Sequence, residues 1–144
     1  MAGNDEPLNV YHSRVRTHQT DLNGAMYHGA FLDTFEEARV DVFRRAGYSY
    51  DRMLEAGWYP VIRHVECDFY RPLRMDEPFQ VTVTVAGLTA ATLTVQYECA
   101  SDGDPAALGR VVFAFLDGRH KITRVPRDLR AVIEENAGAL GYRR

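Results

Sequence analysis

Several features that would assign this chain to a specialised class are scarce in its sequence. Among 144 residues there are two cysteines, Cys67 and Cys99, with neither a CxxC pair nor the spacing of metal ligands. Both lie in stretches where apolar and polar residues alternate, so we interpret them as buried free thiols. Unpaired thiols are typical of a reducing compartment, and a cytoplasmic location is therefore expected.

Long apolar runs and an excess of positive charge are missing as well. No stretch reaches the roughly 18 apolar residues of a candidate transmembrane helix. Residues 1–7 are polar and acidic, unlike a signal peptide. The formal net charge is −3, whereas a protein that neutralises phosphates needs a basic surface. We therefore expect neither a membrane nor a nucleic acid as partner.

The remaining composition fits one ordinary globular domain. Hydrophobic residues make up 46% and charged residues 26% of the chain, and this length can bury a core without disulfides or a metal. The five histidines lack the close paired spacing of a typical zinc site, so no metal is expected. We predict a single domain over residues 1–144, with a core from about 9 to 126 and a C-terminal helix from about 126 to 137.

The first half of the chain predicts one long helix. A stripe of apolar residues starts after His28 and has helical spacing; its members are Phe31, Phe35, Ala38 and Val42. Gly47 is a natural end for this helix. A shorter helix is expected over 49–56, with Ser49 as its N-cap.

The second half predicts strands in close succession. Alternating patterns occupy residues 61–70, 79–85 and 92–99. Residues 108–117 predict a more fully buried strand, because apolar residues fall on both faces; a sixth strand is expected to run from 120 to 125, and residues 9–16 can form a first strand. We interpret residues 101–105 as a loop. Strands this close leave no room for crossover helices and must be antiparallel. The predicted fold is therefore α+β, a curved antiparallel sheet of five to six strands wrapped around one long central helix. Its uncovered edges favour a homodimer or homotetramer.

The segment with chemical content is residues 17–39, THQTDLNGAMYHGAFLDTFEEAR. Asp21 lies in a glycine-containing loop that leads directly into the long helix. The first turn of a helix presents unpaired N–H groups that can stabilise an oxyanion. A carboxylate beside it can activate water or attack a carbonyl carbon. The same pattern also suits a turn aspartate that bonds its own backbone, and His28 also suits a packing role. Glu36 and Glu37 suit solvated or structural roles.

The segment from Val15 to Arg39 resembles the 4-hydroxybenzoyl-CoA thioesterase family, most closely its YbgC-like acyl-CoA thioesterase branch. The resemblance covers residues from about 10 to 126, including VIRHVECDFYRPLRMDEPF at 61–79. The matching motif residues are Thr20-Asp21, Gly24, Tyr27-His28, Phe31 and Glu36-Glu37-Ala38-Arg39.

This resemblance implies a hotdog fold, hydrolysis of an acyl-CoA thioester, and active sites at the interface of a dimer. It places Asp21 on the catalytic position, as general base or nucleophile. His28 falls where a backbone N–H polarises the thioester carbonyl, with Tyr27 beside it. Many relatives have an acid two residues before the catalytic one, whereas this chain has Gln19.

Substrate contacts are expected from several further residues. Gly29 offers a second backbone N–H at the helix start. The other candidates are Phe31 for the acyl group, with Trp58, Tyr59 and Tyr70, and Arg63, Arg71, Arg74 and Arg124 for the coenzyme A phosphates. Apart from coenzyme A in the substrate, no cofactor is implied. Two alternatives stay open: a hotdog hydratase or dehydratase acting on acyl thioesters, and a non-catalytic acyl-CoA-binding module. The acyl group, and whether coenzyme A or acyl carrier protein carries it, are not specified by the sequence.

Overall fold

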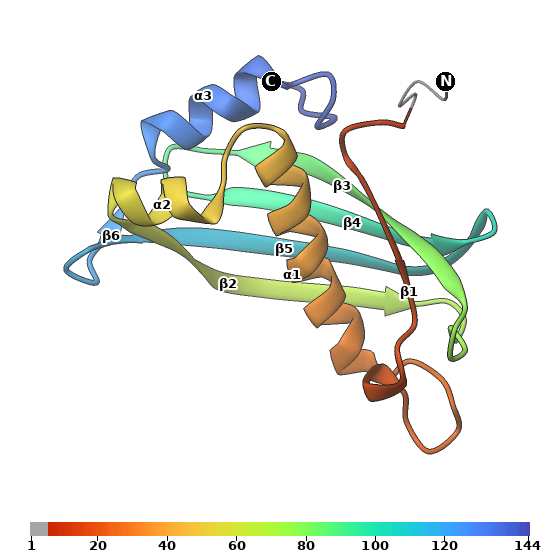
Figure 1. Ribbon diagram of the computed structural model, residues 1–144. Coiled ribbons are helices and arrows are strands. Elements are labelled where there is room, and N and C mark those ends of the chain that lie inside the picture. Colours follow the sequence, from red (N-terminus) through yellow and green to blue (C-terminus); the bar gives the residue numbers. More distant parts are fainter. Residues whose placement is uncertain (1–5) are drawn as a thin grey trace.

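The computed structural model describes residues 6–144, which form a curved antiparallel sheet with one long helix across its concave face (Figure 1). The strands are β1 (Val10–Arg14), β2 (Trp58–Phe69), β3 (Pro78–Leu88), β4 (Leu93–Ser101), β5 (Asp104–Asp117) and β6 (Ile122–Thr123). The helices are the 3-10 turn η1 (Thr17–Gln19), α1 (His28–Arg45), α2 (Tyr50–Ala56) and α3 (Arg127–Glu135). The predicted α+β class and its central helix are confirmed.

The strands pair in the order β1-β3-β4-β5-β2, and β6 pairs with β5. The predicted stripe of α1 is buried against this sheet: Phe31, Phe35, Ala38 and Val42 are each at most 3% exposed. Phe35 stacks on Tyr97 of β4 with ring centroids 4.8 Å apart. A Cβ at position 109 would lie 2.4 Å from the Phe35 ring. Gly109 of β5 therefore lets the helix approach the sheet closely.

Three predictions about the strands were wrong in detail. Residues 101–105 are not a loop, because β5 already begins at Asp104 after a tight turn with Asp102 and Gly103 at positive φ. The predicted strand at 120–125 is reduced to two residues. In β2 a bulge lies between Ile62 and His64. The side chains from Arg63 onward therefore do not keep the alternation between the two faces of the sheet that residues before the bulge begin, as the pattern over 61–70 had predicted.

The two cysteines differ in their burial. Cys99 is 1% exposed, and burial raises the pKa of its thiol to about 12. Cys67 is only half-buried, so the prediction that both thiols are buried was wrong for this residue. Its exposure has a simple cause: Cys67 lies on β2, the edge strand, which among the described residues pairs with β5 alone.

The exposed edge of β2 carries apolar side chains. Ile62, Val65 and Phe69 are 52%, 38% and 49% exposed. Each lies opposite an inward-facing residue of β5 and thus on the concave side of the sheet. Leu32 and Val40 of α1 are also exposed. We refer to these five residues, which the described residues 6–144 leave exposed, as the β2–α1 strip.

The C-terminal helix α3 closes the end of the core near the α1–α2 corner (Figure 1). Its buried residues are Leu129, Val132 and Ile133. Ser49 caps α2 as predicted, accepting a hydrogen bond of 3.1 Å from the Arg52 N–H. In the described part of the chain, no helix combines the length and the apolarity needed to cross a bilayer.

Candidate active site

The loop that carries Asp21 is an Asx turn with one carboxylate oxygen left open. Asp21 Oδ1 accepts hydrogen bonds from the N–H groups of Asn23 (2.8 Å) and Ala25 (3.3 Å). Gly24 has a φ of +74°, which glycine adopts without strain. Over residues 6–144, no hydrogen bond falls on Asp21 Oδ2, and the residue is exposed. The turn therefore fixes the carboxylate and leaves Oδ2 available to an incoming group.

The segment Leu73–Met75 holds this loop from one side. The N–H of Met26 donates to the Leu73 carbonyl at 2.8 Å, and the N–H of Met75 donates to the Gly24 carbonyl at 3.1 Å. The Arg74 guanidinium donates to the Asn23 carbonyl at 3.2 Å. The Asp21 turn is thus tied to a distant part of the chain by both backbone and side-chain bonds.

Glu77 in turn holds the segment around Arg74. Its carboxylate accepts hydrogen bonds of 3.0 Å from the Arg74 N–H and 3.0 Å from the Arg71 guanidinium. The bond from the Arg74 N–H, supported by Arg71, lowers the pKa of Glu77. Arg71 also donates to the Ser101 carbonyl at 3.2 Å. The ionised Glu77 therefore stabilises the segment that supports the Asp21 loop.

The N-terminus of α1 begins two residues after this loop. Its N-cap is Tyr27, whose side chain makes no capping hydrogen bond. The N–H groups of His28 and Gly29 have no acceptor within residues 6–144, because the first N–H bonded at this end is that of Ala30 to the Tyr27 carbonyl. A Cβ on residue 29 would lie 2.7 Å from the Tyr27 ring. Gly29 thus lets the Tyr27 ring cover the first turn, next to two free donors.

An exposed carboxylate in the loop that leads into an uncapped helix N-terminus suits attack on a carbonyl whose oxygen becomes negative. A family model described as "Thioesterase-like superfamily" matches residues 15–133, most of the chain. The chain belongs to this superfamily.

Three proteins show how similar its relatives are. A protein of Aquifex aeolicus whose name describes it as an esterase is 26% identical over 126 residues, covering 88% of this chain and 98% of that protein. The acyl-CoA thioesterase YbgC of Haemophilus influenzae is 24% identical, with 87% and 90% covered. A crystal structure from Thermus thermophilus superposes with a TM-score of 0.83 at 27% identity, covering 88% of this chain and 98% of that one. This thioester hydrolase thus has the hotdog fold.

In this thioesterase the residue that departs from the family pattern has a structural role. Gln19 is 7% exposed. Its side-chain oxygen accepts a hydrogen bond of 2.8 Å from the Arg16 N–H, and its amide lies 3.5 Å from the Thr34 hydroxyl of α1. The side chain thus contacts the backbone of Arg16 and the hydroxyl of Thr34 on α1. An acid here would lack the amide donor that faces Thr34.

The arginines predicted to bind coenzyme A differ in whether their side chains are already bonded to other residues. Arg71 is tied to Glu77 and Ser101, and Arg74 to Asn23. Arg63 is exposed at the bulge of β2 and Arg124 is exposed after β6; neither makes an ion pair with any residue from 6 to 144. Arg74 thus lies against the Asp21 loop, whereas the Arg71 side chain is held by Glu77 and Ser101.

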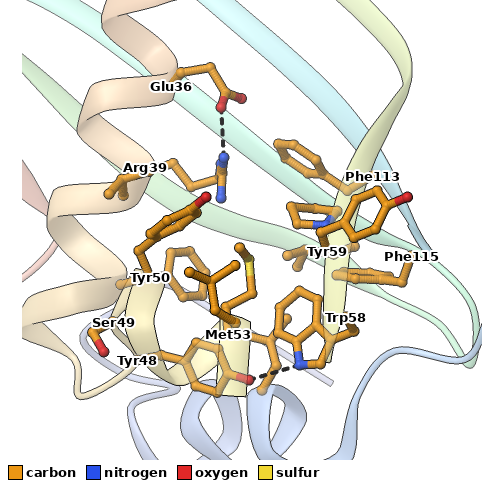
Figure 2. A pocket seen from close by; sticks show the side chains of 16 residues that line it. Glu36, Arg39, Tyr48, Ser49, Tyr50, Met53, Trp58, Tyr59, Phe113 and Phe115 are labelled. Atoms are coloured by element: carbon orange, nitrogen blue, oxygen red, sulfur yellow. Dashed lines mark hydrogen bonds and ion pairs between the residues drawn. The ribbon is translucent and has the colours of Figure 1, made fainter. Parts of the chain in front are cut away.

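The aromatic residues predicted for the acyl group do not form one cluster. Phe31 is 3% exposed and packs edge-on against Phe69 at 5.4 Å, close to the start of α1. Trp58 and Tyr59 instead line a cavity of about 490 Å³ between α1, α2, β2 and β5 (Figure 2). Neither Phe31 nor Tyr70 lines it.

This cavity was missed at the level of sequence, although one signal was present. Seven aromatic residues line it, and four of them fall between positions 48 and 59: Tyr48, Tyr50, Trp58 and Tyr59. Glu36 and Arg39 form an ion pair of 2.7 Å at one end of the cavity (Figure 2). Glu36, interpreted from the sequence as solvated or structural, thus faces the cavity. Within residues 6–144, no three His, Cys, Asp or Glu side chains gather as metal ligands would.

Proposed function

We propose that this protein hydrolyses acyl-CoA thioesters to a free acid and coenzyme A, with Asp21 as general base or nucleophile. One observation carries the proposal: Asp21, whose Oδ2 is open, lies in a loop that folds back on itself and leads directly into the free N–H groups of His28 and Gly29. The names of relatives that act on acyl-CoA support the same substrate class.

The chemistry follows from the charges that develop on the thioester. As a nucleophile adds to the carbonyl carbon, its oxygen becomes an oxyanion, which the N–H groups of His28 and Gly29 and the α1 dipole stabilise. Asp21 either takes the proton of the attacking water, or attacks the carbon itself to form a mixed anhydride that water then hydrolyses to the free acid. Coenzyme A leaves as a thiolate, a good leaving group that needs no strong acid. The Tyr27 ring lies against Gly29, next to these N–H donors.

The proposed active form is a homodimer, or a homotetramer built from dimers. The β2–α1 strip and the free edge of β2 support this proposal, because an exposed apolar edge strand invites pairing with a second copy. A two-fold axis across β2 would continue the sheet and cover the strip in both subunits.

A turnover assay on a panel of acyl-CoA esters, with a thiol reagent that detects released coenzyme A, tests the function. Hydrolysis with a kcat/KM of at least about 10⁴ M⁻¹s⁻¹ on the best ester is expected. Binding of the esters without release of thiol would contradict the proposal and would favour a binding module.

A further inference from the structure

The loop that carries Asp21 is closed at its base by Gln19. The N–H of Tyr27, the N-cap residue of α1, donates to the Gln19 carbonyl at 3.0 Å. Within the loop, the Asp21 N–H donates to the Ala25 carbonyl at 2.8 Å. Residues 20–26 therefore leave η1, turn back and enter α1 beside the point where they began (Figure 1). The position of Asp21 relative to the helix start thus depends on how Gln19 is held.

The Gln19 side chain attaches the base of the loop to α1 at a second point. Its amide nitrogen donates to Thr34 Oγ1 at 3.5 Å. With a rise of about 1.5 Å per residue, Thr34 lies about 9 Å along α1 from His28. A loop that is joined to a helix at one point can rotate about that point. Two attachments separated along the helix restrict this rotation and so define the direction of the loop.

Donors and acceptors match along this contact. The Arg16 N–H donates to Gln19 Oε1 at 2.8 Å, so the atom of Gln19 that faces Thr34 is the amide nitrogen, a donor. The Thr34 hydroxyl donates its proton to the Ala30 carbonyl at 2.8 Å. Its lone pairs are therefore free to accept from the Gln19 amide. One chain of hydrogen bonds thus runs from the backbone before the loop to the first turns of α1.

The burial of these two polar side chains calls for a reason. Gln19 and Thr34 are 7% and 1% exposed. Aromatic residues aside, the buried polar side chains of residues 6–144 are those of Gln19, Thr34 and Ser101, and two of these three meet at the base of the Asp21 loop. A buried amide or hydroxyl gains little stability over an apolar group of the same shape. The geometry that the pair imposes therefore explains its presence better than the stability of the core does.

We propose that Gln19 and Thr34 are positioning residues for the hydrolysis. Their contact fixes the direction of the Asp21 loop on α1. It thereby sets where the Asp21 carboxylate stands relative to the free N–H groups of His28 and Gly29. The inference rests on the proposed function. Neither residue of the pair touches the reacting atoms, and both act through the loop. Such a role matters because a displacement of about 1 Å at a reacting group can lower a rate by about 10²-fold.

Replacing each partner by an apolar residue of similar shape tests this role. Gln19→Met and Thr34→Val should each lower kcat on the best acyl-CoA ester by at least about fivefold. KM should stay within about twofold of the wild-type value, because the contacts to the ester are unchanged. The double variant should match Gln19→Met within about twofold, because both changes remove the same contact. Thr34→Ser keeps the hydroxyl and should retain the wild-type kcat.

Asn136→Leu is the matched control, because it removes an amide that ties α3 to the opposite end of α1. The Asn136 amide donates to the carbonyl of Ala46, the C-cap residue of α1, at 3.3 Å. Its loss should lower the urea midpoint of unfolding and leave kcat unchanged. The same pattern in Gln19→Met and Thr34→Val, or additive losses in the double variant, would overturn the inference. If Gln19→Met does not fold, the comparison of Thr34→Val with Thr34→Ser decides.

Amide hydrogen exchange measures the loop itself and does not depend on activity. The N–H groups of Asn23 and Ala25 donate to Asp21 Oδ1 and report on the turn. They should exchange at least about fivefold faster in Thr34→Val than in the wild type or in Thr34→Ser. Unchanged exchange in Thr34→Val would overturn the inference, whether or not the wild type is active. A wild type that hydrolyses no ester would instead count against the proposed function, and the exchange rates would still test the attachment of the loop.

Discussion

The Arg74 guanidinium donates a hydrogen bond of 3.2 Å to the Asn23 carbonyl, linking residues 51 positions apart. The bond joins the segment after β2 to the turn whose first residue is Asp21. Arg74 was expected to bind a coenzyme A phosphate, whereas the structure shows that its side chain supports the Asp21 loop. Substrates with and without the coenzyme A phosphates distinguish phosphate binding from support of the loop.

Replacing Arg74 with Met should reduce kcat by about 3- to 10-fold, on the scale of one typical hydrogen bond. If Arg74 supports the loop, the loss should be equal for a CoA ester and for the same acyl group on N-acetylcysteamine, which lacks phosphates. Arg63→Met is the control: this substitution should raise KM, and only for the CoA ester. A loss confined to CoA esters in Arg74→Met would contradict the supporting role.

Glu77→Gln should lower the stability of the fold at neutral pH by about 1 kcal/mol. The folded-state pKa of Glu77 is lowered, so its ionised form contributes stability that is present above the ordinary value of 4.5 and is lost as pH falls through the folded value. The difference between variant and wild type should therefore shrink below pH 4.5.

Urea unfolding at pH 7 and at about pH 3 measures this difference. Glu55→Gln on the exposed face of α2 is the control and should change neither midpoint. A destabilisation by Glu77→Gln that grew toward low pH would contradict the account of its pKa.

Val65→Lys should break the subunit interface, because it places a charge in the β2–α1 strip. Light scattering should give the wild type at least twice the chain mass of 16.3 kDa, and the variant about that mass. Ile122→Lys is the control, since Ile122 is 79% exposed on β6, away from β2. An active wild-type monomer, or a dimeric Val65→Lys protein, would contradict the proposed interface.

The local elements of this fold could be predicted because their signals are local. The buried stripe of α1 and the Ser49 cap depend on residues within a few turns of each other. The Asp21 turn likewise depends on Asn23 and Ala25, its close neighbours. The structure shows that both interpretations of Asp21 are compatible: Oδ1 makes the turn and Oδ2 stays open.

The structural features that the sequence did not predict depend on residues that are far apart in the chain. The bulge beside Arg63 shifts one strand against its partner β5, and the spacing of residues along β2 does not reveal it. The cavity draws Arg39, Trp58 and Leu129 from three separate elements. Cys67 resembles Cys99 in its alternating context, yet the edge position of β2 leaves it half-buried. Strand order decides such exposure, and it is a property of the whole sheet.

The kcat of Asp21→Asn tests the central claim most directly. Asn keeps the oxygen that accepts from Asn23 and Ala25 and replaces Oδ2 by an amide, so the turn should remain intact. A fall in kcat of at least about 10²-fold, roughly 3 kcal/mol in activation free energy, is expected with little change in KM. Glu37→Gln, an exposed acid on α1, should cost much less. A folded, oligomeric Asp21→Asn protein that kept more than about a third of wild-type kcat on its best ester would contradict a catalytic role for Asp21.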